Sequence, residues 1–266
     1  MQKDYRPIEK NLIDDSEIKR IDAYWSSVWA DREFTPSQIF RQIENCDEYK
    51  VIDKYLQKLP NTASILDGGC GMGEWSVYLK SRGYKITGLD ISSSTIERLK
   101  SVFLEHDWQV GDINNLEFGD KTFDAYLSWG TFEHFEAGLL APIKEAWRVL
   151  KPGGYLFISV PQDSLRLMHE RYGRWQPNIA KSRLKQAFYQ WRLTKREIAF
   201  EVEQEDFEIK SIVPIHKQEG VGRLFRLITN CEPSGLIKGR LVNILAKILP
   251  GIFAGHMLIL VAQKKT

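Results

Sequence analysis

The chain has 266 residues, of which 43% are hydrophobic and 27% charged. This composition is that of an ordinary globular protein with one large domain, or with a domain that carries elaborations. The formal net charge of +2 is too small to indicate a nucleic-acid-binding protein by itself. The N-terminus lacks the apolar core of a signal peptide, and no uncharged apolar run reaches the roughly 18 residues of a transmembrane helix. We therefore expect a cytoplasmic protein, whose three scattered cysteines form neither a disulfide framework nor a zinc-binding pattern.

Residues 14–59 predict an N-terminal helical segment, because apolar side chains recur there at helical spacing. A second helix is expected to run from Pro36 to Leu59. Trp25 and Trp29 are four residues apart, so they share one face of the first helix. They can pack into the core or close a ligand site, and aromatic pairs at this spacing favour the core.

A glycine-rich turn follows the short apolar strand that ends at Asp67. Gly69, Gly71 and Gly73 alternate with other residues, and a helix is expected over residues 74–81. Alternating glycines permit positive φ angles and let the backbone approach a ligand closely. The spacing differs from the G-x-G-x-x-G pattern of dinucleotide-binding enzymes.

A second strand is predicted over residues 85–90, followed by a helix that ends at Val102. Asp90 ends this strand, where a carboxylate can accept hydrogen bonds from both hydroxyls of a ribose. Alternatively, Asp90 only precedes Ser92, which is a good N-cap residue for the helix.

Residues 108–113 and 123–130 predict two more strands, and a helix is expected from Ala137 to Leu150. A Pro-Gly-Gly turn then leads into a fifth strand that ends at Val160. This alternation of strands and helices predicts an α/β fold with parallel strands and right-handed crossovers.

The five motifs, in this order across roughly residues 60–160, resemble those of class I S-adenosylmethionine-dependent methyltransferases of the small-molecule type. The Phe-Asp…Glu-His and Pro-Gly-Gly motifs are shared with quinone-biosynthesis-like methyltransferases. The resemblance implies a Rossmann-like seven-stranded sheet of order 3-2-1-4-5-7-6 with the last strand antiparallel, in which residues 207–213 and 256–262 are the sixth and seventh strands. It also implies that an N-terminal helical segment, residues 1–60, covers the cofactor site of a methyltransferase domain, residues 61–266.

The resemblance further implies S-adenosylmethionine as the cofactor and S-adenosylhomocysteine as the product, with no metal. The glycine loop would hold the methionine portion and Asp90 the ribose. Asp112 and Ile113 would contact the adenine, and Ile91 would pack on it. Backbone carbonyls at the end of the fourth strand would bind the ammonium group. The predicted cofactor-binding residues are Asp67, Gly68, Gly69, Gly71, Gly73, Asp90, Ile91, Asp112, Ile113, Ser128 and Trp129.

Methyl transfer from a sulfonium is an in-line displacement in which the protein mainly aligns the acceptor atom. His134 is the candidate general base, because the ordinary pKa of a histidine lies near neutrality. Alternatively, His134 only lines the pocket; Glu133 and His169 are weaker candidates for the base. Residues 128–131 stand where nucleobase amino-methyltransferases carry an Asn-Pro-Pro-Tyr signature, which disfavours methylation of a nucleobase amine.

Two insertions depart from the minimal fold, at about residues 161–196 and 214–255. The first carries nine Lys or Arg against one acid over residues 166–196, with aromatic residues between them, and ends in a capping box, Thr194–Glu197. The second contains a broadly apolar helix over residues 236–249. We expect both insertions to fold over the mouth of the site and to suit an acceptor with an anionic head and an apolar tail, met at a membrane surface. Alternatively, the apolar helix buries its face on the sheet or in a dimer.

The function predicted on these grounds is methyl transfer to a small-molecule or lipid-linked acceptor. The alternatives left open are methylation of a protein or an RNA, and non-catalytic binding of S-adenosylmethionine. Nucleic acid is the less favoured partner. The sequence does not determine the acceptor, the acceptor atom or the oligomeric state.

Overall fold

The computed structural model describes residues 1–7, 16–30, 32, 36–164, 186–229 and 236–266. The central sheet is formed by β2 (Ser64–Gly68), β3 (Lys85–Asp90), β4 (Asp107–Val110), β5 (Phe123–Trp129), β6 (Leu150–Pro161), β8 (Phe207–Ile215) and β9 (Met257–Lys264).

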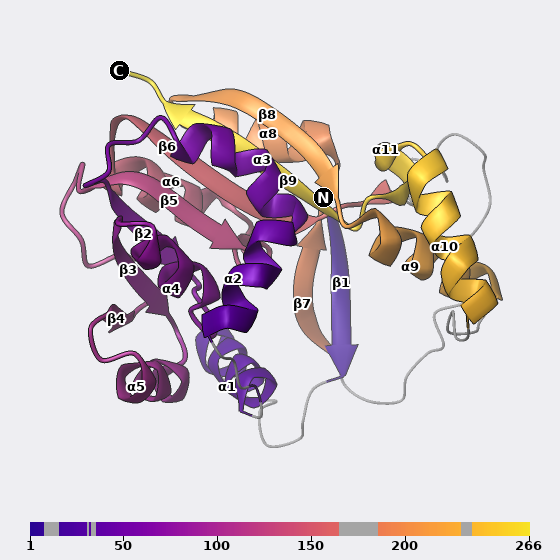
Figure 1. The fold of residues 1–266 in the computed structure, drawn as a ribbon, viewed down its shortest axis with the longest axis horizontal. Coiled ribbons are helices and arrows are strands. Elements are labelled where there is room, and N and C mark those ends of the chain that lie inside the picture. The colour runs from indigo at the N-terminus through magenta and orange to yellow at the C-terminus, as the bar shows by residue number, and fades with distance from the viewer. Residues whose placement is uncertain (8–15, 31, 33–35, 165–185, 230–235) are drawn as a thin grey trace.

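These seven strands lie in the order β4-β3-β2-β5-β6-β9-β8 (Figure 1). Neighbouring strands pair in parallel from β4 to β6, whereas β9 is antiparallel to both β6 and β8. The predicted fold class, strand order and antiparallel strand are therefore confirmed. Parallel strands end at the same edge of a sheet, so Asp90 and Trp129, which end β3 and β5, lie along one edge.

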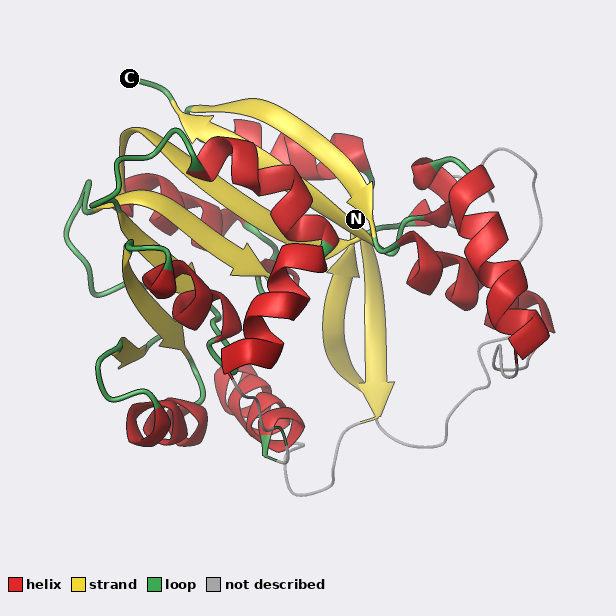
Figure 2. Cartoon of the chain, in the orientation of Figure 1, coloured by secondary structure: helices red, strands yellow, loops and turns green. Residues whose placement is uncertain are grey.

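Helices cover both faces of the sheet (Figure 2). The alternation of side chains along each strand gives one apolar core per face. The helices of the first face are α2 (Pro36–Asn45), α3 (Asp47–Leu56), α4 (Glu74–Ser81) and α5 (Ser93–Val102), and those of the second are α6 (Leu140–Val149) and α8 (Lys195–Glu203). For example, Ile65 packs in the core beneath α2 to α5, and Leu66 packs in the core beneath α6 and α8.

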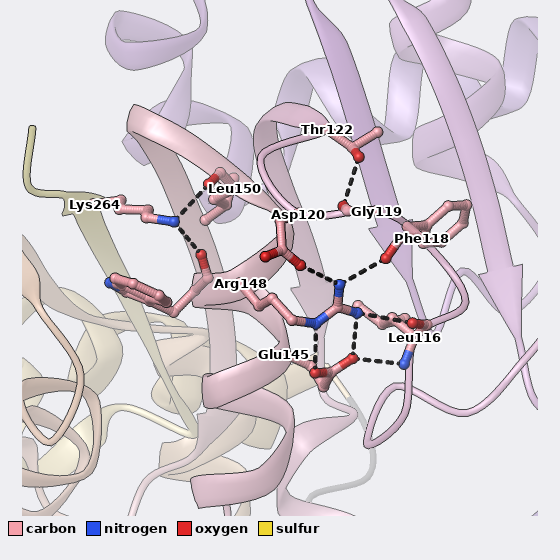
Figure 3. A network of polar contacts seen from close by, with 10 residues as sticks. Leu116, Phe118, Gly119, Asp120, Thr122, Glu145, Arg148, Leu150 and Lys264 are labelled. Carbon is pink, nitrogen blue, oxygen red and sulfur yellow. Dashed lines mark hydrogen bonds and ion pairs between the residues drawn. The ribbon is translucent and has the colours of Figure 1, made fainter.

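The opposite, amino edge of the sheet is held by two cationic side chains (Figure 3). At the end of α6, the Arg148 guanidinium donates to both carboxylate oxygens of Glu145 at 2.7 and 2.8 Å, and to the backbone carbonyls of Leu116 and Phe118. Lys264 of β9 donates to the backbone carbonyls of Trp147 and Leu150 at 2.7 and 2.8 Å. Arg148 thereby ties α6 to the connection between β4 and β5, and Lys264 ties β9 to the end of α6, at the edge opposite the candidate site.

The prediction of a single helix from Pro36 to Leu59 is wrong, because the helix is interrupted at Cys46, between α2 and α3. Cys46 has an extended backbone, with φ −72° and ψ 158°, and its Sγ accepts a hydrogen bond from the backbone N–H of Tyr49 at 3.4 Å. It therefore acts as the N-cap of α3, although cysteine is not a typical capping residue.

A second, two-stranded sheet pairs β1 (Gln2–Pro7) with β7 (Gln186–Arg192) in antiparallel fashion. Neither strand was predicted: the N-terminal segment was expected to be helical, and residues 186–192 were assigned only to the first insertion. The predicted capping box is present directly after β7, where Thr194 and Glu197 exchange hydrogen bonds at the start of α8.

The described residues of the second insertion form three helices, α9 (Lys217–Thr229), α10 (Leu236–Ile248) and α11 (Gly251–Ala254), at one end of the long axis of the molecule (Figure 1). They share a small core of their own, in which α10 packs on α9. The alternative that α10 buries its apolar face on the sheet is therefore wrong. Among the described helices, none combines the length and apolar character needed to cross a bilayer.

Candidate functional site

The glycine loop after β2 is shaped by three residues with positive φ, Gly69, Gly71 and Gly73, at 76°, 51° and 74°. The loop folds onto the end of β3. The backbone N–H of Gly69 donates to the carbonyl of Leu89 at 2.7 Å, and that of Gly71 donates to the Asp90 carboxylate at 2.9 Å. A Cβ atom at Gly69 would lie 2.3 Å from the Thr131 hydroxyl, so only glycine fits there.

Asp90 is buried at the centre of this arrangement. One carboxylate oxygen accepts from Gly71 and the other from the backbone N–H of Ser92, at 2.9 Å each. Burial raises the pKa of Asp90, and these backbone donors oppose that shift by stabilising the ionised form. Ser92 also caps α5 through a bond from the Thr95 N–H. The two interpretations of Asp90 are thus compatible, because it precedes the cap and also faces a cavity.

The cavity lies at the carboxyl edge of the sheet and contains about 510 Å³ of space, which includes solvent at its open mouth. Eight predicted site residues line it: Gly69, Gly71, Asp90, Ile91, Asp112, Ile113, Trp129 and His134. Seven further lining residues were not predicted as site residues: Ile21, Trp25, Trp29, Gly111, Gly130, Thr131 and Phe135.

The other four predicted cofactor-binding residues, Asp67, Gly68, Gly73 and Ser128, are not part of the cavity wall. Asp67 is buried behind the loop, where it accepts a hydrogen bond from the Ser76 hydroxyl at 2.7 Å, and burial raises its pKa to about 7. Ser128 donates to the carbonyl of Gly68 at 2.7 Å. These residues support the loop from its far side.

At the other end of the cavity, His134 lies in the short 3-10 helix η2 (Phe132–His134) that follows β5. Its Nδ1 lies 2.7 Å from the backbone carbonyl of Tyr189 in β7. Because a carbonyl can only accept, Nδ1 carries a proton, and Nε2 is the ring nitrogen that can gain or lose one. The rings of Trp25 and Tyr189 contact the imidazole, with centroids 5.2 and 5.0 Å away.

The two weaker candidates for a base differ from His134 in position. Glu133 is fully buried outside the cavity wall, and burial raises its pKa to about 8, so it is mainly protonated at neutral pH. His169 lies outside the described residues, as does most of the basic stretch of the first insertion.

The helix α1 (Glu17–Trp29) closes the cavity from the side opposite the sheet. Its thirteen residues, all described, include none that is buried, so the expectation that Trp25 and Trp29 pack into the core is wrong. Their rings stack at 5.4 Å and line the cavity above Gly71.

Polar contacts hold α1 on α5. The Ser26 and Ser92 hydroxyls are 2.7 Å apart, and the Arg98 guanidinium donates to the carbonyls of Trp29 and Ala30 at 3.0 Å and to that of Arg32. Arg98 therefore occupies the carbonyl end of α1, where a cation is favoured.

The chemistry of the cavity wall suits an organic ligand. Isoleucine, tryptophan and phenylalanine residues make up much of its lining, namely Ile21, Trp25, Trp29, Ile91, Ile113, Trp129 and Phe135. The described part of the chain contains no group of three or more His, Cys, Asp or Glu that could hold a metal.

Residues 65–154 match a family model described as a methyltransferase domain. The chain is 35% identical to a malonyl-[acyl-carrier protein] O-methyltransferase of Erwinia billingiae over 115 residues, and this aligned region covers 42% of this chain and 44% of that protein. It is 33% identical to a demethylmenaquinone methyltransferase of Staphylococcus epidermidis over 150 residues, and this aligned region covers 51% of this chain and 61% of that protein. The chain thus spans about half the length of these curated relatives.

Solved structures share the fold at lower identity. An S-adenosylmethionine-dependent methyltransferase from Methanosarcina mazei matches with a TM-score of 0.55 and 22% identity, over 82% of this chain and 98% of that one. The 1,6-didemethyltoxoflavin-N1-methyltransferase of Burkholderia thailandensis, solved with its substrate and S-adenosylhomocysteine, matches with a TM-score of 0.56 and 17% identity, over 100% and 96% of the two chains.

Proposed function

We propose that this chain, which belongs to the class I S-adenosylmethionine-dependent methyltransferases, transfers a methyl group to a small-molecule or lipid-linked acceptor. One observation carries the proposal. The glycine loop with Asp90 and the candidate base His134 line the same cavity at the carboxyl edge of the sheet. Ligands of open α/β sheets bind at this edge, where the strand order reverses between β2 and β5.

The residues of the cavity fit S-adenosylmethionine. Gly69 and Gly71 line the cavity, where their backbone would meet the methionine portion, and the Asp90 carboxylate would accept from the ribose hydroxyls. Asp112 and Ile113 would contact the adenine, with Ile91 against its face. Asp67, Gly68, Gly73 and Ser128 would contribute indirectly, by keeping the loop in shape.

When bound, the cofactor supplies an electrophilic methyl group on its sulfonium. The protein must hold the acceptor atom within about 3–3.5 Å of that methyl carbon and in line with the bond that breaks. We assign His134 the role of general base, in which Nε2 takes the proton that the acceptor loses. The bond from Nδ1 to the Tyr189 carbonyl fixes the tautomer and the orientation of the ring for this step.

The acceptor class is inferred from the relatives and from the walls of the cavity. The named relatives are methyltransferases of malonyl-[acyl-carrier protein] and of demethylmenaquinone. Around His134 the wall includes Trp25 and Phe135, and the ring of Tyr189 packs against the imidazole. Such walls favour a flat or apolar head, and the basic first insertion favours an anionic one.

We also propose that the N-terminal segment, residues 1–60, covers the cofactor site of the methyltransferase domain, residues 61–266. Support comes from α1, whose Ile21, Trp25 and Trp29 line the cavity. A cover of this kind excludes water and strengthens the electrostatic interactions inside the site.

Turnover tests the proposal directly. The purified chain is incubated with isotopically methyl-labelled S-adenosylmethionine and a panel of quinols, phenols, fatty acids, acyl carrier protein thioesters and sugar lipids. Label in one of these acceptors, with stoichiometric S-adenosylhomocysteine, is the expected result. Cofactor binding by calorimetry without turnover on any acceptor would instead indicate a non-catalytic binding protein. Label in RNA or protein from a cell extract, with none in the panel, would indicate a macromolecular acceptor.

A further inference from the structure

An apolar stripe runs along the exposed side of α10. Leu241, Ile244 and Ile248 are 46%, 54% and 71% exposed, and Ile252 of the following helix α11 is 41% exposed. The first three residues are spaced by three and four, so they lie on one face of the helix.

The other side of α10 is already packed. Val242 and Ala246 are buried against Val221 of α9 and Ala254 of α11. The exposed stripe is therefore not needed for the core of this helical cluster. A helix that is apolar on two sides, with one side buried internally, has a second surface to cover.

The charges beside the stripe have one sign. Arg240 and Lys247 are exposed and adjoin Leu241 and Ile248 in the sequence. From Leu236 to Ala254 the sequence contains three basic residues and no acidic one. Long basic side chains next to exposed isoleucines can extend toward anionic headgroups while their stems stay on apolar surface.

The position of the cluster relates it to the site. The helical cluster is inserted between two strands: α9 begins directly after β8, and α11 ends directly before β9. The strand β8 runs parallel to β6, because both are antiparallel to β9. The cluster therefore extends from the same carboxyl edge of the sheet that carries Asp90 and Trp129. In Figure 1 it lies at the opposite end of the molecule from α5.

We propose that this surface, Leu241, Ile244, Ile248 and Ile252 with Arg240 and Lys247, docks on a bilayer that contains anionic lipids. The inference rests on the proposed function, because it names the place where a lipid-linked acceptor is met. A second copy of the chain is the less suitable occupant. A two-fold interface would bring the Arg240 and Lys247 side chains of both copies together around one apolar patch, and like charges at an interface are unfavourable.

The test is sedimentation with vesicles of phosphatidylcholine, with and without phosphatidylglycerol. We expect the parent chain to bind the anionic vesicles and to bind the neutral ones at least tenfold more weakly. A triple variant, Leu241→Ser, Ile244→Ser and Ile248→Ser, should lose at least tenfold in binding to anionic vesicles. A charge-reversal variant, Arg240→Glu and Lys247→Glu, should lose the preference for phosphatidylglycerol. The matched control is Val102→Ser with Leu104→Ser, which removes exposed apolar side chains, 61% and 81% exposed, at the α5 end.

The control should bind vesicles as the parent does, and all variants should keep cofactor affinity and the thermal transition of the parent. No vesicle binding by the parent, or an equal loss in the control, would overturn the proposal. A dimer in light scattering that the triple variant abolishes, without vesicle binding, would assign the surface to a second copy and also overturn it. If the parent binds vesicles but methylates no acceptor, the docking surface stands and the proposed function fails.

Discussion

The two sides of the cavity are built in different ways. On the cofactor side, the lining residues come from short motifs at or just after the ends of β2, β3, β4 and β5, and Gly71 bonds Asp90 across 19 positions of the chain. On the acceptor side, the walls come from α1 and η2, and η2 is buttressed by β7, whose Tyr189 binds His134 across 55 positions of the chain. The cofactor side thus depends on contacts between successive strand–helix units, whereas the acceptor side depends on pairings between more distant segments. Substitutions should accordingly separate cofactor affinity from turnover.

The largest effect is expected at His134, on the acceptor side. His134→Ala should lower the turnover rate by about 10²–10⁴, because a general base contributes about that much. Cofactor affinity should stay near that of the parent. Rates measured across pH, with calorimetry for the cofactor, check both expectations.

His134→Asn sharpens this test. The Asn amide can still donate to the Tyr189 carbonyl, but it has no nitrogen that can accept a proton near neutral pH. If the Asn variant retains most of the activity, His134 only lines the pocket and holds β7. If both variants lose activity equally and the acidic limb of the pH profile disappears, the base is assigned.

On the cofactor side, Asp90→Ala should weaken S-adenosylmethionine binding by roughly 1.5–3 kcal/mol, the usual worth of a hydrogen bond to a charged group. That is about 10–150-fold in Kd. Asp107→Ala, which removes an exposed carboxylate from the neighbouring strand β4, is the control. Unchanged affinity in a folded Asp90→Ala protein would remove Asp90 from the ribose site.

Asp67 provides the contrast within the same motif. Because it lies behind the loop and an Asn oxygen can still accept from the Ser76 hydroxyl, Asp67→Asn should keep cofactor affinity close to that of the parent. A loss as large as that of Asp90→Ala would show that Asp67 contacts the cofactor after all.

A smaller effect is expected at Arg98, which holds α1 over the cavity. Arg98→Ala removes the bonds to the carbonyl end of α1, so this helix should be held less firmly and cofactor binding should weaken by about 3–10-fold, the worth of roughly one hydrogen bond. Lys100→Ala, an exposed cation on the same helix α5, is the matched control. Equal affinities for the two variants would argue against a covering role of α1.

The same contrast explains what the sequence could predict. The positions of Gly69, Gly71 and Asp90 follow from local patterns, because a strand end, a glycine turn and a helix cap are determined by neighbouring residues. The strand order, in contrast, was implied by the resemblance to the methyltransferase family. The pairing of β1 with β7 joins Gln2 to Arg192, and no local pattern specifies a contact over that separation.

Trp25 and Trp29 are a second example of a contact that local sequence patterns do not specify. Their spacing correctly places them on one face of α1, but amphipathic periodicity does not say whether that face meets the core or a cavity. The answer depends on the docking of α1 on α5, through Ser26 and Arg98, which is again a contact between distant segments.

The smallest effect concerns the ion pair that joins α3 to the helical cluster, between Glu48 of α3 and His216, the residue just before α9. His216 Nε2 lies 2.9 Å from the Glu48 carboxylate, and this hydrogen bond raises the pKa of His216 above its ordinary 6.5. Burial opposes the ionised form of Glu48, but the bond and the charge of His216 leave its pKa below the ordinary 4.5. The pair therefore stabilises the fold fully between about pH 4.5 and 6.5. This contribution is lost as the pH rises through the raised pKa of His216, or falls through the lowered pKa of Glu48.

A double-mutant cycle with Glu48→Gln and His216→Asn isolates the pair, because Asn tolerates the positive φ of 55° at this position. Urea unfolding near pH 6 should give a coupling free energy of about 0.5–1 kcal/mol, reduced by solvent because the imidazole is partly exposed. The coupling should fall as the pH rises through the raised pKa of His216. A coupling that does not change with pH on the alkaline side would mean that the contact is a neutral hydrogen bond, and that charge does not tie the helical cluster to α3.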